Sequence, residues 1–377
     1  MQNNKLTLVV DGNWLLMSRY FMKRDTFRMN LPDSVKENSS HQLADLMAQS
    51  ISVILRQFRG SITNIIFVSD NRSWRKDYPM PLCIETTDTY KGTRKNDETY
   101  DWKYIYKSIS ILSNNLKSIG VTTSNVYGVE GDDWCWWWSR KLNSEGTNVI
   151  LWTSDEDIKQ LIQEDEDTGA FTAWYEKSKG LVLNSSMKPK KFDDEDDELG
   201  SFMAPIMPVN NIIKSLSKTT SVSYVNPINI INKKIYIGDQ GDNILPVFTY
   251  SKKSKIYKAT QKDWSKLINF DNPGYIEKDW CNKLPKLYNE IYKIKTKGDE
   301  QNITTCDDFI EHAVYNKKMV WLDESQIPRD VQSQMTSVEY KEISPDLLHD
   351  ITYNWKVMSG AASKELEDLF EGEFMFQ

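Results

Sequence analysis

Acidic residues cluster directly after two apolar stretches near the middle of the chain. The stretches span residues 121–129 and 148–153. The acids that follow them are Glu130, Asp132, Asp133, Asp155 and Asp157. Apolar stretches of this length are typical of buried parallel strands, whose carboxyl ends hold the ligand site of open α/β sheets. Carboxylates this close repel one another unless a cation lies among them, so the pattern predicts a site for Mg²⁺, which prefers oxygen ligands.

Four further acids follow other predicted strands. They are Asp11 after residues 5–10, Asp70 after residues 62–69, and Asp239 and Asp242 after residues 234–238, which we interpret as a last strand. A single aspartate in such a position can be a simple cap, but chance seldom places acids after so many strands. We therefore expect all nine acids at one edge of one sheet.

Basic and aromatic residues in the segment after Asp70 suit a phosphate ligand. They form the sequence Tyr90-Lys91-Gly92-Thr93-Arg94-Lys95. At helical spacing Lys91, Arg94 and Lys95 share one face, which could hold a phosphate while Tyr90 offers a ring for base stacking. The alternative is a solvated basic loop without such a role.

The composition disfavours several classes of protein. The chain has 377 residues, of which 39% are hydrophobic, and no stretch approaches the ~18 apolar residues of a membrane span. Its four cysteines lie far apart without a Cys-x-x-Cys pair, which predicts a reduced, cytoplasmic setting with neither zinc nor disulfides. With only three histidines, catalytic triads and histidine-ligated metals are disfavoured.

The net charge of −7 is unevenly distributed. Without the nine acids of the predicted site and the six of residues 193–198, the rest of the chain carries a charge of +8. A basic remaining surface suits contacts with a nucleic-acid backbone. The candidate contacts are Arg72, Arg75, Lys95, Lys252, Lys253 and Lys255.

We predict an α/β nuclease-like core followed by a smaller, mainly helical domain. The core spans residues 1–245 and has a Rossmann-like (PIN-like), mostly parallel sheet, an arch at about 86–100 and an exposed acidic insertion at about 184–205. Other predicted elements are helices at 41–59 and 100–119 and a hairpin at 170–183 at the sheet edge. The helical domain spans 246–377 and binds DNA. Its last residues, 366–377, are acidic with aromatic anchors and either dock on the chain's own core or bind a partner.

Six short motifs occur in the order found in the structure-specific 5′-nuclease (flap endonuclease) superfamily. They are Val10-Asp11-Gly12, Val68-Ser69-Asp70, Tyr90-Lys91-x-x-Arg94, Glu130-Gly131-Asp132-Asp133, Thr153-Ser154-Asp155-x-Asp157 and Gly238-Asp239-x-x-Asp242-Asn243. One motif alone is weak evidence, whereas six in order are strong. Residues 5–245 thus resemble this superfamily, and most of all the ribonuclease H group of T-even bacteriophages. Residues 246–253 depart from the pattern because they lack the glycine-rich turn that grips duplex DNA in many members.

The resemblance implies a nuclease of lagging-strand replication that removes RNA primers and adjacent DNA. It implies 5′-3′ exonuclease, flap endonuclease and RNase H activity on DNA and RNA/DNA duplexes, 5′ flaps and forks. The cofactor would be two Mg²⁺ ions, which Mn²⁺ could replace. We further expect a monomer in the cytoplasm, which is that of the host cell if the chain is phage-encoded, with a sliding clamp and a single-strand-binding protein as possible partners.

Within this pattern we assign roles to individual residues. The acids expected around the catalytic ion are Asp11, Asp70, Asp132 and Asp155. Those expected around the second ion, largely through water, are Glu130, Asp157, Asp239 and Asp242, and Asp133 could join either. Lys91 and Arg94 would polarise the scissile phosphate, while Tyr90 would stack on the terminal base.

Two other interpretations stay open. A PIN-like ribonuclease would use the same sheet and acids on single-stranded RNA, but the predicted arch and the basic stretch after residue 245 argue against it. A non-catalytic replication scaffold would carry a relic metal site. Against the scaffold, surplus buried acids would destabilise a fold that bound no metal.

Overall fold

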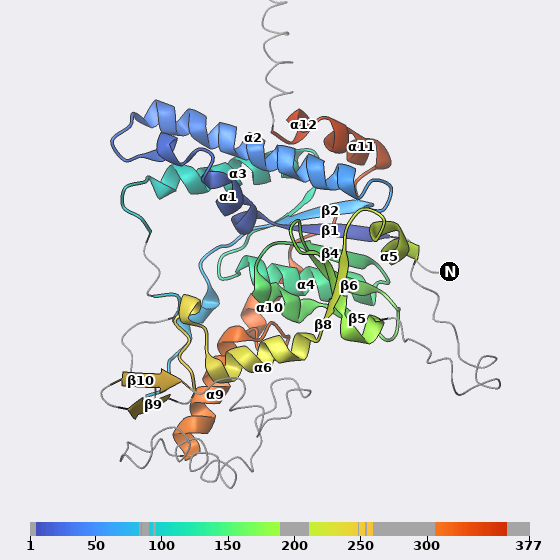
Figure 1. Ribbon diagram of the computed structural model, residues 1–377. Coiled ribbons are helices and arrows are strands. Elements are labelled where there is room, and N and C mark those ends of the chain that lie inside the picture. Colours follow the sequence, from blue (N-terminus) through green and yellow to red (C-terminus); the bar gives the residue numbers. More distant parts are fainter. Residues whose placement is uncertain are drawn as a thin grey trace, which may run out of the picture.

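A central sheet with helices on both faces forms the body of the molecule (Figure 1). The computed structural model describes residues 5–82, 84, 90–92, 96–188, 211–247, 249–252, 255–258 and 306–359. The strand order is β3-β2-β1-β4-β6-β7-β8, with β5 beside β6. The strands are β1 (Leu6–Asp11), β2 (Asn64–Val68), β3 (Thr122–Ser124), β4 (Asn148–Trp152), β5 (Gln163–Glu164), β6 (Phe171–Glu176), β7 (Gly180–Asn184) and β8 (Val222–Val225). Outside this sheet, β9 (Thr249–Lys252) and β10 (Lys255–Lys258) pair antiparallel.

The core strands run parallel, which confirms the predicted fold class. Strand β1 pairs in parallel with β2 and β4, and β3 and β6 continue the parallel set on either side. Side chains of β1 alternate between the two faces: Leu8 and Val10 pack into one apolar cluster and Val9 into the other. Burying each such side chain contributes about 1.5–3 kcal/mol, so β1 is a main source of stability for both layers.

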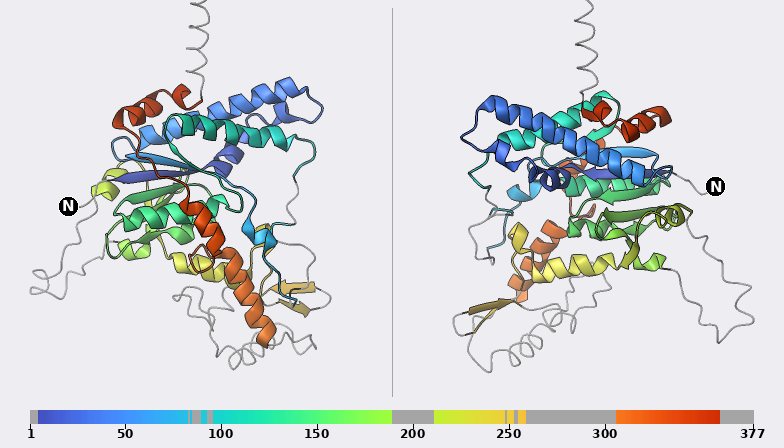
Figure 2. Two further views of the ribbon diagram at one scale, coloured as in Figure 1. Left: turned by 180° about the vertical axis from the view of Figure 1, so that it is seen from behind. Right: turned by 45° about the horizontal axis from the view of Figure 1, so that its top comes forward.

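Helices cover the two faces as separate layers. The layer on the Leu8 side contains α1 (Gly12–Tyr20), α2 (Asp33–Gln57), α3 (Trp102–Ser118), α5 (Asn211–Leu216), α11 (Pro345–Tyr353) and α12 (Lys356–Ser359). The layer on the Val9 side contains α4 (Gly131–Ser144), α6 (Pro227–Ile237), α9 (Cys306–Val320) and α10 (Arg329–Thr336). Figure 2 shows α9 and α10 on the side of the sheet opposite α2 and α3. None of the helices in the described ranges combines the length and apolar character needed to cross a bilayer.

Several sequence-based predictions need correction. Residues 234–238 are not a strand but the end of α6, because Asn226 caps that helix, Pro227 occupies its first turn, and Ile231 and Ile235 bury one face. Of the predicted strand 121–129, only three residues form a strand, β3. The hairpin at 170–183 is present as β6 and β7, yet β8 continues the sheet beyond it.

The predicted arch, insertion and tail fall largely outside the described residues. Within the arch, residues 90–92 form a turn in which Lys91 has a φ of 57°, so no helix begins there. Residues 189–210 and 360–377, which include the acidic run and the tail, are outside the description. Of the predicted C-terminal domain, the described helices α9 to α12 pack into the same two apolar clusters as the sheet.

Candidate metal-binding active site

A cleft of about 1280 Å³ opens at the edge of the sheet where β1, β2 and β4 end. Seven of the nine predicted acids line it: Asp11, Asp70, Asp132, Asp155, Asp157, Asp239 and Asp242. They come from the ends of three strands, the start of α4 and the turn after α6. The structure therefore brings together residues spread over more than half of the chain.

Thr153 couples two of these acids. Asp11 ends β1 and caps α1, and its Oδ1 accepts a hydrogen bond from Trp14 N at 3.0 Å. Its Oδ2 accepts one from the buried Thr153 hydroxyl at 2.8 Å. The same hydroxyl accepts from Asp155 N at 3.0 Å. One threonine thus fixes the ends of β1 and β4 relative to each other.

Asp70 is held against the first turn of α4. Its Oδ1 accepts a hydrogen bond from Gly131 N at 2.6 Å, and its own N–H donates to Asn13 Oδ1 at 2.8 Å. A Cβ on Gly131 would lie 2.9 Å from Asp70 Oδ1, so a side chain at this position would push the carboxylate away. Glycine is needed here for close approach.

A second group of acids lies at the end of α6. Oxygen atoms of Asp157, Asp239 and Asp242 lie within 4.8 Å of one another, an arrangement that could hold a metal ion. Lys234, on the last turn of α6, forms ion pairs with Asp157 and Asp239, the latter at 2.5 Å. The sequence does not reveal Lys234 at this site because the pattern of residues 234–238 predicts a strand.

Burial and mutual repulsion act on the acids of the cleft. Burial raises the pKa of Asp11, and it raises the pKa of Asp70 to about 7 together with the charges of Glu130 and Asp11. Burial likewise raises the pKa of Asp157 to about 6, although Lys234 opposes the shift. The pKa of Asp132 rises well above its usual value because of burial and the charge of Asp155. These acids favour an added cation.

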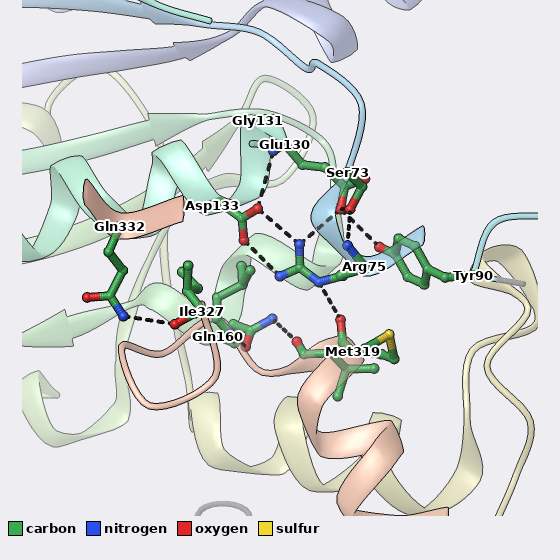
Figure 3. A network of polar contacts seen from close by, with 12 residues as sticks. Ser73, Arg75, Tyr90, Glu130, Gly131, Asp133, Gln160, Met319, Ile327 and Gln332 are labelled. Atoms are coloured by element: carbon green, nitrogen blue, oxygen red, sulfur yellow. Dashed lines mark hydrogen bonds and ion pairs between the residues drawn. The ribbon is translucent and has the colours of Figure 1, made fainter. Parts of the chain in front are cut away.

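Two predicted acids belong instead to a buried ion-pair network (Figure 3). The Arg75 guanidinium is 2% exposed and contacts Asp133 through both terminal nitrogens, at 2.8 and 3.0 Å. It also donates to Glu130 Oε2 at 3.0 Å, while Lys91 donates to Glu130 Oε1 at 2.5 Å. Burial alone would raise the pKa of Glu130, but the charges of Lys91 and Arg75 lower it to about 2.

The network bears on three predicted roles. Arg75 is unavailable to a nucleic acid because its guanidinium is buried and bonded to Glu130 and Asp133. Asp133 and Glu130 do not line the cleft, and their predicted places around a metal ion stay predictions. Tyr90 is 5% exposed and donates to Asp242 Oδ2 at 3.1 Å, so its ring is not open to a base.

The other predicted basic residues have varied outcomes. Lys91 lines the cleft, and Arg72 is exposed beside Asp77. Arg94, Lys95 and Lys253 lie outside the described residues, as do the side chains of Lys252 and Lys255 in β9 and β10. Their predicted contacts with nucleic acid stay predictions.

Helix α9 and Leu322, just after it, form hydrogen bonds with Arg75, with the segment after β4 and with the main chain of α6 and the turn after it. Arg75 Nε donates to Met319 O at 2.9 Å. The buried Gln160 donates to Val320 O at 3.1 Å and accepts from Leu322 N at 2.9 Å. Asn316 donates to Ile235 O and Leu245 O, both at 2.8 Å. Nothing in the spacing of these polar residues could have revealed partners so distant in the sequence.

The first half of the chain matches a known protein family. Residues 6–194, half of the chain, match the family model of the 5′-3′ exonuclease N-terminal resolvase-like domain. The chain therefore belongs to the 5′-3′ exonuclease family, which confirms the resemblance drawn from the six motifs. Its closer likeness to the phage ribonuclease H group stays a prediction.

Two curated relatives are 5′-3′ exonucleases of Buchnera aphidicola. The protein from the subspecies Schizaphis graminum is 25% identical over 158 residues, which are 42% of this chain and 49% of the relative. The protein from the subspecies Acyrthosiphon pisum is 23% identical over 243 residues, 64% of this chain and 75% of the relative. The match thus spans about half of the first relative's length.

Solved structures of a phage T5 protein also align with the chain. A T5 D15 flap endonuclease complex with DNA and metal ions aligns over 94% of this chain and 99% of its own, with 14% identity and a TM-score of 0.46. The T5 D15 protein crystallised with metal ions aligns over the same shares, with 13% identity and a TM-score of 0.42. These scores are below 0.5, so the family assignment depends on the sequence match.

Proposed function

We propose that the chain is a Mg²⁺-dependent, structure-specific 5′-nuclease that hydrolyses phosphodiesters at the 5′ ends of RNA/DNA and DNA/DNA duplexes. The observation that carries this proposal is the meeting of seven acids from separate elements in one cleft, with Lys91 at its wall. Membership of the 5′-3′ exonuclease family supports the reaction class. The expected activities are 5′-3′ exonuclease, flap endonuclease and RNase H activity.

The cleft acids suit two divalent cations. Carboxylate oxygens are the ligands that Mg²⁺ and Mn²⁺ prefer, and a cation would relieve the repulsion that raises the pKa of Asp70 and Asp132. The candidate ligands are Asp11, Asp70, Asp132 and Asp155 for one ion and Asp157, Asp239 and Asp242 for the other. Such ions assist the attack of water on a phosphodiester and stabilise the leaving oxygen.

Lys91 supplies a fixed positive charge to the same cleft. Burial opposes its charged form, but Glu130 together with Tyr90, Asp132 and Asp242 outweighs burial and raises the pKa of Lys91. The ammonium therefore stays protonated and would stabilise charge that develops on the phosphate. Its backbone N–H donates to Asp242 O at 2.9 Å, so the residues at 90–92 are attached to the second group of acids. Arg94 would extend this positive region.

In the cell, this activity would remove RNA primers and adjacent DNA during replication. The substrates would be 5′ ends, flaps and forks, with the exposed Arg72 and the lysines near residues 252–255 as further backbone contacts. A sliding clamp and a single-strand-binding protein are candidate partners through residues 366–377. The chain would act as a monomer in the host-cell cytoplasm.

A cleavage assay on a 5′-flapped duplex, labelled at the 5′ end, tests the proposal. Wild-type protein with Mg²⁺ should release short labelled products. We expect EDTA to abolish them and Asp155→Asn to reduce them by at least about 10²-fold, because one preorganised electrostatic contact is worth that much. Asp167→Asn is a matched control, since Asp167 is exposed in a turn away from the cleft.

The outcomes separate the alternatives. Products that persist in EDTA, or with Asp155→Asn at full rate, would contradict the metal site. Tight binding of flapped and RNA-primed duplexes without cleavage would favour the scaffold interpretation. Cleavage confined to single-stranded RNA would favour a PIN-like ribonuclease.

A further inference from the structure

The wall of the cleft opposite α6 is aromatic. It is lined by Trp14 and Met17 of α1 and by Trp102 and Tyr106 of α3. The α6 wall carries Asn229, Lys233 and Lys234 together with the aliphatic Ile230 and Ile237, and it has no aromatic ring. Acids form the surface between these two walls, so the aromatic side chains lie on one wall only.

Of the two aromatic residues of α3, Trp102 packs partly against the core, whereas Tyr106 does not contribute to it. The buried face of α3 is supplied by Ile105, Ile109, Leu112 and Leu116. Trp102 and Tyr106 lie one helical turn apart beside that face, and the Tyr106 side chain is 43% exposed. Large aromatic side chains left partly open beside a reactive centre indicate a ligand.

The two rings are preorganised. Trp102 Nε1 donates to Asp97 O at 2.9 Å, and Tyr20 packs against the indole with ring centroids 5.4 Å apart. The rings of Trp102 and Tyr106 are 5.9 Å apart and inclined by 38°. A ring held in this way stacks on a flat ligand at low entropic cost.

We propose that Trp102 and Tyr106 form a stacking platform for the bases of the unpaired strand of a flapped substrate, an inference that rests on the proposed function. Nucleobases are the flat ligands that accompany a phosphodiester, and stacking tolerates any sequence. The bases would face α3 while the sugar–phosphate backbone runs past the acids toward Lys233. A nicked duplex has no unpaired strand and would not use the platform, so these residues would set the preference for flaps.

Kinetics on matched substrates test this inference. For a flapped duplex, Tyr106→Ala should raise KM about tenfold with kcat unchanged, since stacking on one base has this value. For a nicked duplex, KM should not change. Tyr106→Phe keeps the ring and should restore wild-type values. Tyr127→Ala is the matched control, because Tyr127 is 60% exposed and does not line the cleft.

Fluorescence separates this inference from the proposed function. In Ca²⁺ in place of Mg²⁺, 2-aminopurine in the flap should be quenched by wild-type protein and by Tyr106→Phe, but regain emission with Tyr106→Ala or Trp102→Ala. Equal effects of Tyr106→Ala on flapped and nicked substrates, or no effect on either, would overturn the platform. If wild-type protein cleaves nothing, the proposed function fails, and the quenching alone then decides whether the platform binds unpaired bases.

Discussion

Asp132 and Asp133 are neighbours in the sequence, yet their side chains lie in different environments. Asp132 lines the cleft, and burial together with the charge of Asp155 raises its pKa well above the usual value. Asp133 is fully buried on the other side of α4 and accepts two hydrogen bonds from Arg75. Successive residues of a helix point about 100° apart, so one step along α4 separates the two environments.

The same contrast holds for the larger groups. In the cleft, burial and the charges of Glu130 and Asp11 raise the pKa of Asp70 to about 7. In the buried network, cations already neutralise the carboxylates, and the pKa of Glu130 is about 2. One group thus favours an added cation, while the other carries its own. Asp157 lies between these cases, because Lys234 pairs with it but leaves its pKa raised to about 6.

The strongest test of this contrast removes the internal cation. Arg75→Met leaves Asp133 buried without its partner and Glu130 with Lys91 alone, and breaking a buried ion pair in this way costs about 3–5 kcal/mol. Urea unfolding should show this loss. Arg72→Met is the control, because its exposed pair with Asp77 should contribute less than about 1 kcal/mol. A loss below about 1 kcal/mol for Arg75→Met would mean that the network does not stabilise the fold.

The strand ends were predictable from the sequence because buried parallel strands leave continuous apolar stretches. Asp11, Asp70 and Asp155 follow such stretches, and the structure places them in one cleft. The direction of a side chain within the following helix was not predictable, so Asp133 was placed in the same group as Asp132. The strand prediction also failed for α6, whose last residues, 234–237, are too few and too apolar to show a helical period.

Partners distant in the sequence were beyond prediction. Lys234 could have been placed beside Asp239 only if α6 had been recognised as a helix. The contact of Arg75 with Met319 O joins residues 244 positions apart through a main-chain oxygen that carries no sequence signal. Such contacts depend on where α9 packs, which the pattern of its apolar residues does not specify.

A substitution in the cleft should change the free energy of unfolding by a smaller amount and in the opposite direction. Asp70→Asn keeps an oxygen for Gly131 N but removes a charge that Asp11 and Glu130 repel. In EDTA at pH 8 the variant should be more stable to urea, by on the order of 1 kcal/mol after allowance for solvent in the open cleft. Cleavage should fall by at least about 10²-fold. If the variant is less stable than the wild type in EDTA, the charge of Asp70 stabilises the fold, as we expect for Asp133.

The smallest effect is a pH dependence of the metal-free protein. The pKa of Asp70 is about 7 in the folded state against 3.8 for an exposed aspartate, so the folded state binds this proton first. Its contribution to stability is therefore present at low pH and is lost as the pH rises through 7. Between pH 8 and 6.5, acidification in EDTA should raise Tm by about 1–2 °C.

The lower limit of that pH range follows from His312. Burial lowers its pKa to about 4 from 6.5, so below pH 6.5 the unfolded chain takes up a proton that the folded chain refuses, and stability falls. Glu130, with a pKa of about 2, contributes only below about pH 4.5. Differential scanning calorimetry of wild type and Asp70→Asn isolates the aspartate, because the variant should lose the rise in Tm. If Tm of the wild-type protein still rises on acidification in saturating Mg²⁺, the ion does not bind at Asp70. The acids of the cleft and those paired with Arg75 would then not differ in their need for a cation.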